Sequence, residues 1–222
     1  MTVTKKRAAG VLMHISSLHG DYSVGSFGKE ALEFIDFLAD AGFSYWQVLP
    51  FCIPDECDSP YKSVSAFSGN PYFIDLPTLF EQGLLTKSEL DAARQKSPYL
   101  CEFDRLREER FTLLSLAASR VKDRKPVMNF LQAHPQIDLF CRYMAIKAKN
   151  GGSCWNEWEN EDADEEILWV WQFTQYEFCR QWLLLKDYAN KRGISIIGDI
   201  PIYVAYDSSD VWANRELFLL NK

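Results

Sequence analysis

A strand–helix–strand pattern near the start of the chain constrains its fold more than any other feature. Residues 10–15 form a short apolar run typical of a buried strand, and residues 44–49 form a second one that ends at Pro50. Between them, apolar side chains recur at helical spacing over 28–41, and Gly42 supplies a C-terminal stop. Such a βαβ unit has parallel strands and a right-handed crossover. The sequence therefore predicts an α/β protein.

The rest of the chain is predicted to be mostly helical, with one further strand. Thr86 and Glu89 have the spacing of a capping box, which predicts a helix start at that point. Three longer helices are predicted at 104–122, 136–149 and 163–191. A turn is expected at 125–126, and residues 194–197 form a third buried strand. The stretch from about 86 to 163 is expected to pack as a helical insertion subdomain.

Composition excludes several classes of function. The 24 Lys and Arg residues are outnumbered by 31 Asp and Glu, and a net charge of −7 disfavours nucleic acid as a partner. Six cysteines without CxxC spacing and three histidines indicate free thiols in a reducing cytoplasm, with no metal site. No run of about 18 apolar residues occurs, so no membrane-spanning helix is expected.

Polar side chains follow the second predicted strand at its carboxyl end, where parallel α/β folds gather reactive groups. The loop at 51–70 carries Asp58, Ser59 and Tyr61. They supply a carboxylate, a hydroxyl and an aromatic ring, which suit the hydroxyls and faces of sugars. The same residue types also occur in polar surface loops held by proline and glycine turns. Both interpretations stay open from the residues alone.

Two further candidates lie at the ends of the other strands. Asp199 follows the third predicted strand, where it is either a catalytic or orienting carboxylate or the partner of a helix end or an arginine. His14 ends the first strand, where it either reaches a site or is a satisfied core histidine. Neither GxGxxG nor GxxxxGK[ST] occurs, which disfavours a nucleotide-binding protein.

Six blocks of residues stand out along the chain. They are Arg7-Ala-Ala-Gly-Val-Leu12, Tyr45-Trp-Gln-Val-Leu-Pro50, Asp58-Ser-Pro-Tyr61, Ser65-Ala-Phe-Ser-Gly-Asn-Pro-Tyr72, Gln175-Tyr176 with Gln181-Trp182, and Gly198-Asp-Ile-Pro-Ile-Tyr-Val204 with Asp207-Ser208 and Asp210-Val-Trp212. In this order they resemble the amylomaltases, which are the 4-α-glucanotransferases of glycoside hydrolase family 77. The resemblance runs from about residue 7 to the end of the sequence.

The resemblance implies a (β/α)8 barrel with helical insertions and no metal or organic cofactor. It also implies transfer of α-1,4-glucan segments from a maltooligosaccharide donor to an acceptor, with retention of anomeric configuration. By the same resemblance, Ser59 and Tyr61 line the donor side of the cleft. Asp58 and His14, from their places at the strand ends, are further substrate-binding candidates. Asp199 corresponds to an aspartate that supports the nucleophile and is not itself the nucleophile.

The groups that would make and break the bond are missing from the sequence. A retaining enzyme needs a carboxylate nucleophile and a carboxylic acid about 5 to 5.5 Å apart. The family carries them in Arg-Ile-Asp-His-Phe-Arg-Gly and Ala-Glu-Asp-Leu-Gly segments, and neither occurs here. Three predicted strands are also too few for a closed barrel of eight. Residues 1–222 are therefore expected to be the N-terminal part of an incomplete barrel, inactive by itself; the alternative is a non-catalytic α-glucan-binding module.

Overall fold

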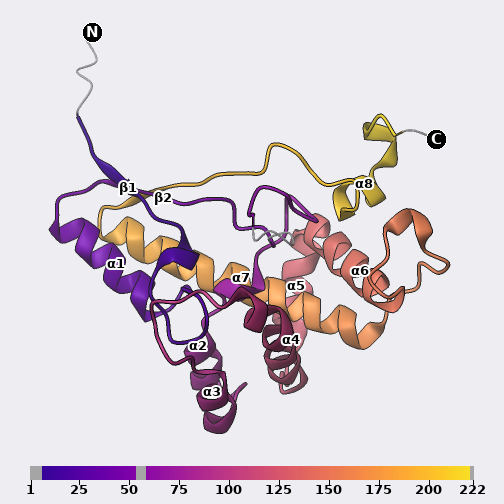
Figure 1. Cartoon of the computed structure of the whole chain (residues 1–222), viewed down its shortest axis with the longest axis horizontal. Helices are drawn as coiled ribbons and strands as arrows, with labels where there is room; N and C mark the ends of the chain where they lie inside the picture. Colours follow the sequence, from indigo (N-terminus) through magenta and orange to yellow (C-terminus); the bar gives the residue numbers. More distant parts are fainter. Residues whose placement is uncertain (1–6, 54–58, 221–222) are drawn as a thin grey trace.

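The computed structural model describes residues 7–53 and 59–220. Three short strands, β1 (Gly10–Leu12), β2 (Tyr45–Gln47) and β3 (Ser195–Ile197), form one parallel sheet in the order β1-β2-β3 (Figure 1). The predicted α/β class and the parallel arrangement of the strands are confirmed. Within the described residues, β1 and β3 each leave one edge of the sheet unpaired.

Helices make up most of the molecule. They are α1 (Lys29–Asp40), α2 (Leu76–Glu81), α3 (Lys87–Ala93), α4 (Phe103–Ser119), α5 (Lys125–Ala133), α6 (Pro135–Lys149), α7 (Glu165–Lys191) and α8 (Ser209–Ala213). Short 3-10 helices lie at Ile15–Ser17, Pro71–Phe73, Trp155–Glu157 and Arg215–Leu217. The longest helix, α7, runs from beneath the sheet, beside α1, across to α6 (Figure 1).

Local signals explain where several helices begin and end. Thr86 accepts a bond from the backbone N–H of Glu89, and the Glu89 carboxylate accepts one from the backbone of Thr86, which confirms the predicted capping box. Asp164 caps α7 by accepting bonds from two backbone N–H groups of its first turn. Gly42 follows α1 with a φ of 79°, as a glycine stop requires.

Some elements differ from the prediction. The turn expected at 125–126 is wrong, because Pro126 lies in the first turn of α5, where its missing N–H costs nothing. The first strand is shorter than 10–15, since the chain coils into a 3-10 turn after His14. Helix α2 was not predicted from the sequence, although its cap Asp75 accepts a bond from the N–H of Thr78.

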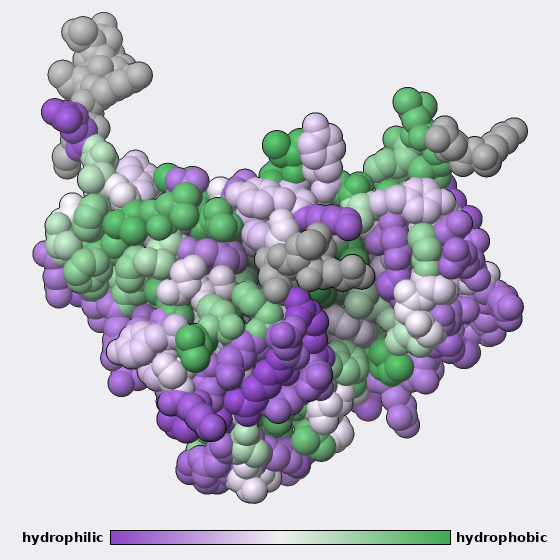
Figure 2. Space-filling view, in the orientation of Figure 1, coloured by the Kyte–Doolittle hydropathy of each residue, from purple (hydrophilic) through white to green (hydrophobic). Residues whose placement is uncertain are grey.

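The two faces of the sheet are covered differently. Trp46, at the centre of β2, is fully buried against α1, with its ring 5.2 Å from that of Phe34. Because side chains alternate along a strand, Gln47 points to the opposite face, together with its register partners Leu12 and Ile197. There Leu12 is 55% exposed and Ile197 is 44% exposed. In Figure 2, hydrophobic residues gather around the strands β1 and β2 and the end of α1. One sheet face is therefore packed on helices and the other is bare.

One hydrophobic core joins the sheet to the helices around it. The main cluster of buried side chains draws on α1, β2, α4, α5 and α7. Two smaller clusters lie beside α6, one of them shared with α8. The helical subdomain expected at about 86–163 stays a prediction.

Candidate functional site

The predicted site residues Tyr61 and Asp199 meet at the carboxyl ends of the strands. The Tyr61 hydroxyl donates a hydrogen bond of 2.9 Å to the Asp199 carboxylate, although the two residues are 138 positions apart. The other Asp199 oxygen accepts a 2.8 Å bond from the N–H of Ile200. Both side chains face solvent, and Tyr61 is 47% exposed. The hydrogen bond to Asp199 also raises the pKa of Tyr61.

The other two loop candidates are placed differently. The Ser59 hydroxyl accepts a bond of 3.4 Å from the backbone N–H of Tyr61, so it helps to set the turn that carries the tyrosine. Asp58 lies outside the described residues. The roles of these residues toward a substrate stay predictions.

Two segments after neighbouring strands run side by side next to this pair. Ser63, after β2, forms a parallel bridge with Val204, after β3. Further along, Ser209 donates its N–H to Val64 at 2.9 Å, and the Asp210 carboxylate accepts the N–H of Ala66 at 3.1 Å. Burial raises the pKa of Asp210. The loop after β2 and the segment after β3 therefore form one wall of the site.

Asp207 anchors the far end of the segment after β3 to α6. Its carboxylate accepts bonds of 2.5 Å from the Tyr143 hydroxyl and the Lys147 ammonium, and a 3.3 Å bond from the N–H of Trp155. Burial alone would raise the pKa of Asp207, but the bonds from Lys147 and Tyr143 hold it below its usual value. The sequence places Asp207 in a motif but does not reveal this anchor, because no local pattern indicates partners 52 to 64 positions away.

His14 is packed inside the protein at the end of β1. Its Nδ1 atom accepts a 3.2 Å bond from the N–H of Leu49, and the rings of Phe51 and Phe73 lie against it. Burial lowers its pKa to about 4, so the imidazole is neutral at pH 7. Of the two possibilities left open by the sequence, this geometry agrees with a core histidine that joins two strand ends. Direct contact with a substrate stays a prediction.

The exposed groups of the site can bind a polyhydroxylated ligand. The carboxylate and phenol oxygens supply acceptors, since the phenol proton is donated to Asp199, and the Tyr61 ring offers a flat apolar face. In the described part of the chain, no three His, Cys, Asp or Glu side chains are grouped as metal ligands would be. No helix of that part is both long enough and apolar enough to cross a bilayer.

A family model matches almost the whole chain. It is described as 4-alpha-glucanotransferase and covers residues 13–222. The chain belongs to this family. The 4-alpha-glucanotransferase of Clostridium butyricum is 44% identical over 95% of this chain. That of Streptococcus pneumoniae serotype 4 is 45% identical over 96% of it. The resemblance stated from the sequence motifs is confirmed.

The solved structures agree with this 4-alpha-glucanotransferase assignment. An amylomaltase from Streptococcus agalactiae in complex with acarbose superposes with a TM-score of 0.90 at 37% identity, and the match covers 98% of this chain. It covers 48% of the amylomaltase, and the matches to the two relatives above cover 47% and 46% of their lengths. The chain thus spans about half the length of the curated relatives it matches.

Proposed function

We propose that this chain supplies the glucan-binding wall of a 4-α-glucanotransferase that moves α-1,4-glucan segments between maltooligosaccharides with retention of configuration. The Tyr61–Asp199 pair at the strand ends carries the proposal, because it presents sugar-binding groups where such folds gather their reactive side chains. Membership of the family supplies the reaction type. The amylomaltase of similar fold was solved in complex with acarbose, which supports a ligand of this kind for the family.

The bare sheet face supports a (β/α)8 barrel as the complete fold. A closed barrel has no unpaired edges, and its interior is filled by side chains from every strand. Leu12 and Ile197 point from the uncovered face as interior residues of a barrel would. The nucleophile and the general acid would come from strands beyond the three described. In that setting Asp199 supports the nucleophile, and the helices between β2 and β3 are an insertion.

The proposed reaction takes place in the cytoplasm. Among the described residues, the cysteines are free thiols, as a reducing compartment favours. The proposed partners are a maltooligosaccharide donor and an acceptor glucan, with no cofactor.

A complementation experiment tests the proposal. The chain is mixed with the part of the Clostridium butyricum enzyme that it does not match, and the mixture is incubated with maltotriose. We expect glucose and longer oligomers from the mixture and none from either half alone. An Asp199→Asn variant in the same mixture should assemble equally well but transfer more slowly. Efficient transfer by this chain alone would contradict the proposed division of roles.

The alternative function, a non-catalytic glucan-binding module, predicts a different outcome. The 47% exposure of Tyr61 is its main support, because an exposed ring can stack on a sugar without any reaction. Maltooligosaccharide binding by this chain, combined with no transfer by an assembled mixture, would favour the module over the enzyme.

Replacing Tyr61 with phenylalanine should separate binding from stability. The variant loses the exposed hydrogen bond to Asp199, so we expect the free energy of unfolding to change by less than about 0.5 kcal/mol. Maltooligosaccharide affinity should fall roughly fivefold, because one hydrogen-bonding hydroxyl is lost while the ring stays. Calorimetry measures both quantities. Tyr99→Phe is the matched control, because Tyr99 is 82% exposed in the loop between α3 and α4. Unchanged affinity in Tyr61→Phe would remove this residue from the site.

A further inference from the structure

A pocket lies away from the strand-end site, among the helices. It has a volume of about 530 Å³ and is lined by α1, α2, α7, the loop after β1 and Arg94. Its lining includes Tyr22, Glu30, Asp75, Glu81, Gln181 and Tyr188. None of His14, Ser59, Tyr61 or Asp199 lines it. We refer to it as the α1–α7 pocket. Its volume lies within the range of ligand-binding cavities.

The floor of the α1–α7 pocket is built from buried polar groups with fixed positions. Asp75 is 6% exposed and accepts bonds of 2.9 Å from the Ser26 hydroxyl and 2.7 Å from the Thr78 hydroxyl. Gln181, 4% exposed, accepts the N–H of Asp75 at 2.7 Å. Because bonds within the protein already fix these side chains, little conformational entropy would be lost on ligand binding.

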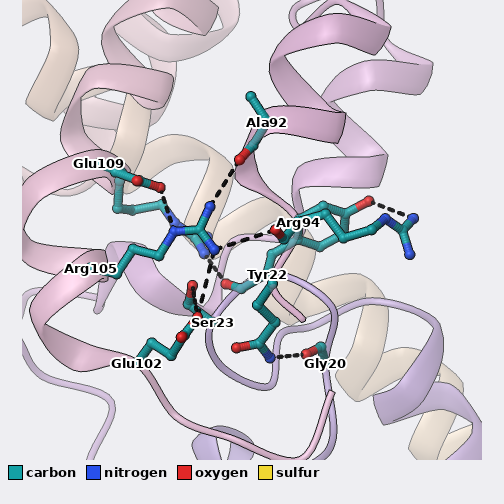
Figure 3. A network of polar contacts seen from close by, with 10 residues as sticks. Gly20, Tyr22, Ser23, Ala92, Arg94, Glu102, Arg105 and Glu109 are labelled. Carbon is teal, nitrogen blue, oxygen red and sulfur yellow. Dashed lines mark hydrogen bonds and ion pairs between the residues drawn. The ribbon is translucent and has the colours of Figure 1, made fainter. Parts of the chain in front are cut away.

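On one side of the pocket, Gly20, Tyr22 and Arg94 belong to the polar network drawn in Figure 3. Arg105 lies at its centre and donates to the carbonyl of Ala92 at 2.9 Å and to Glu109 at 2.8 Å. The backbone of Ser23, in the loop after β1, accepts the N–H of Glu102 at 2.8 Å. Ser23 has a φ of 73°, which is unfavourable for a residue with a side chain. The contacts with α4 hold the loop in this conformation, which is a feature of positioned binding loops.

The charges around the α1–α7 pocket disfavour an anionic ligand. Arg94 is paired with Asp21, and Lys29 is paired with Glu33 at 3.3 Å. Within the described residues, Glu30 and Glu81 form no ion pair, so two carboxylates are left as acceptors. Carboxylates bind hydroxyl groups strongly and repel phosphates or other anions.

Aromatic rings complete a surface of mixed polarity. The Tyr188 hydroxyl already donates to Asp36, and Arg94 donates to the Tyr22 hydroxyl at 3.4 Å and lies 5.6 Å from its ring centre. Both hydroxyls are therefore engaged, and Arg94 covers one face of the Tyr22 ring, so the ring of Tyr188 is the main aromatic surface offered to a ligand. Flat rings beside free carboxylates match a sugar, which has apolar C–H faces and hydroxyl edges.

From these features we propose that the α1–α7 pocket is a second site for α-1,4-glucan, separate from the strand-end site. The choice of glucan among neutral sugars rests on the proposed function. A long glucan held at both sites would dissociate more slowly than one held at either, because the second contact becomes intramolecular.

Amide-resolved NMR tests the second site on the chain as it stands. Maltoheptaose is titrated into the ¹⁵N-labelled protein, and two separate groups of amide resonances should shift, one around Tyr61 and Asp199 and one around Tyr22 and Leu184. In the double variant Glu30→Gln, Glu81→Gln, the affinity measured from the second group of shifts should fall about tenfold or more. The affinity measured from the first group should be unchanged. Tyr188→Phe keeps the ring and should bind as the original does, whereas Tyr188→Ala should not.

The outcomes separate this proposal from the proposed function. Shifts at the α1–α7 pocket without shifts near Tyr61 would contradict the strand-end site but keep the second one. Shifts near Tyr61 alone, at millimolar maltoheptaose, would overturn the second site. Shifts at the pocket with tetramethylammonium and none with maltoheptaose would overturn the ligand class, because the carboxylates would then be serving a cation.

Discussion

Replacing Arg110 with methionine is expected to lower the free energy of unfolding by about 3 kcal/mol or more. Arg110 belongs to α4 and is 3% exposed. Its guanidinium donates to the carbonyls of Tyr22 at 2.8 Å, Ile74 at 3.0 Å and Tyr72 at 3.2 Å. Methionine has a similar length but no donors, so three carbonyl groups would lose their partner. Urea unfolding followed by circular dichroism measures the change.

The size of this effect follows from how completely Arg110 is enclosed. Burial lowers the pKa of Arg110 to about 10, partly opposed by the nearby Asp75, so the guanidinium is still charged at neutral pH. Removing it would also take away a positive charge that interacts with Asp75. The loss of donors and of charge should therefore add to the loss of packing.

Two variants serve as controls for Arg110. Arg110→Lys keeps the charge but cannot reach three carbonyls at once, so an intermediate loss is expected. Arg142→Met removes an arginine whose side chain is 53% exposed and pairs with Asp138 at 3.4 Å, and it should cost less than about 1 kcal/mol. If Arg110→Met and Arg142→Met cost the same, the buried guanidinium is not a central support of the fold.

Lowering the pH from 7 to 5 should cost about 2 kcal/mol of stability through His14. Its pKa is about 4 in the folded protein, because of burial, against 6.5 for an unperturbed histidine. The unfolded chain therefore takes up the proton first, and stability falls as the pH drops through 6.5. The loss levels off below pH 4 at about 3 kcal/mol. Urea unfolding at several pH values measures the slope.

Substitution at two histidines isolates this effect. His14→Asn offers an amide oxygen to the N–H of Leu49 but does not titrate, so most of the fall between pH 7 and 5 should vanish. His19→Asn changes an exposed side chain and should keep the full dependence. A His14→Asn variant with the original pH dependence would show that the proton is taken up elsewhere.

Much of the secondary structure could be predicted because its signals are local. Helix α1 has apolar residues one turn apart, and Ala31, Ile35 and Leu38 are all fully buried. The capping box at Thr86 needs only residues three positions apart. Where a local signal has two meanings, prediction failed. Proline favours both turns and the first turn of a helix, and at Pro126 only the packing of α5 decides between them.

The candidate site could be predicted in part. Its location at strand ends follows from the βαβ pattern and from the rule that parallel sheets carry their sites at that edge. The bond between Tyr61 and Asp199 does not follow, because a separation of 138 residues leaves no periodicity to detect. Asp58 lies outside the described residues, so its place in the site stays a prediction.

By itself, the sequence determined the α/β class, the parallel strands, the family and the list of candidate polar residues, because these depend on periodicity, composition and ordered motifs. The tertiary structure alone decided that Asp207 is tied to α6, that His14 is buried among rings, and that Glu30 and Glu81 share a pocket. Such contacts depend on which surfaces pack together, and packing is a property of the folded chain rather than of any short segment.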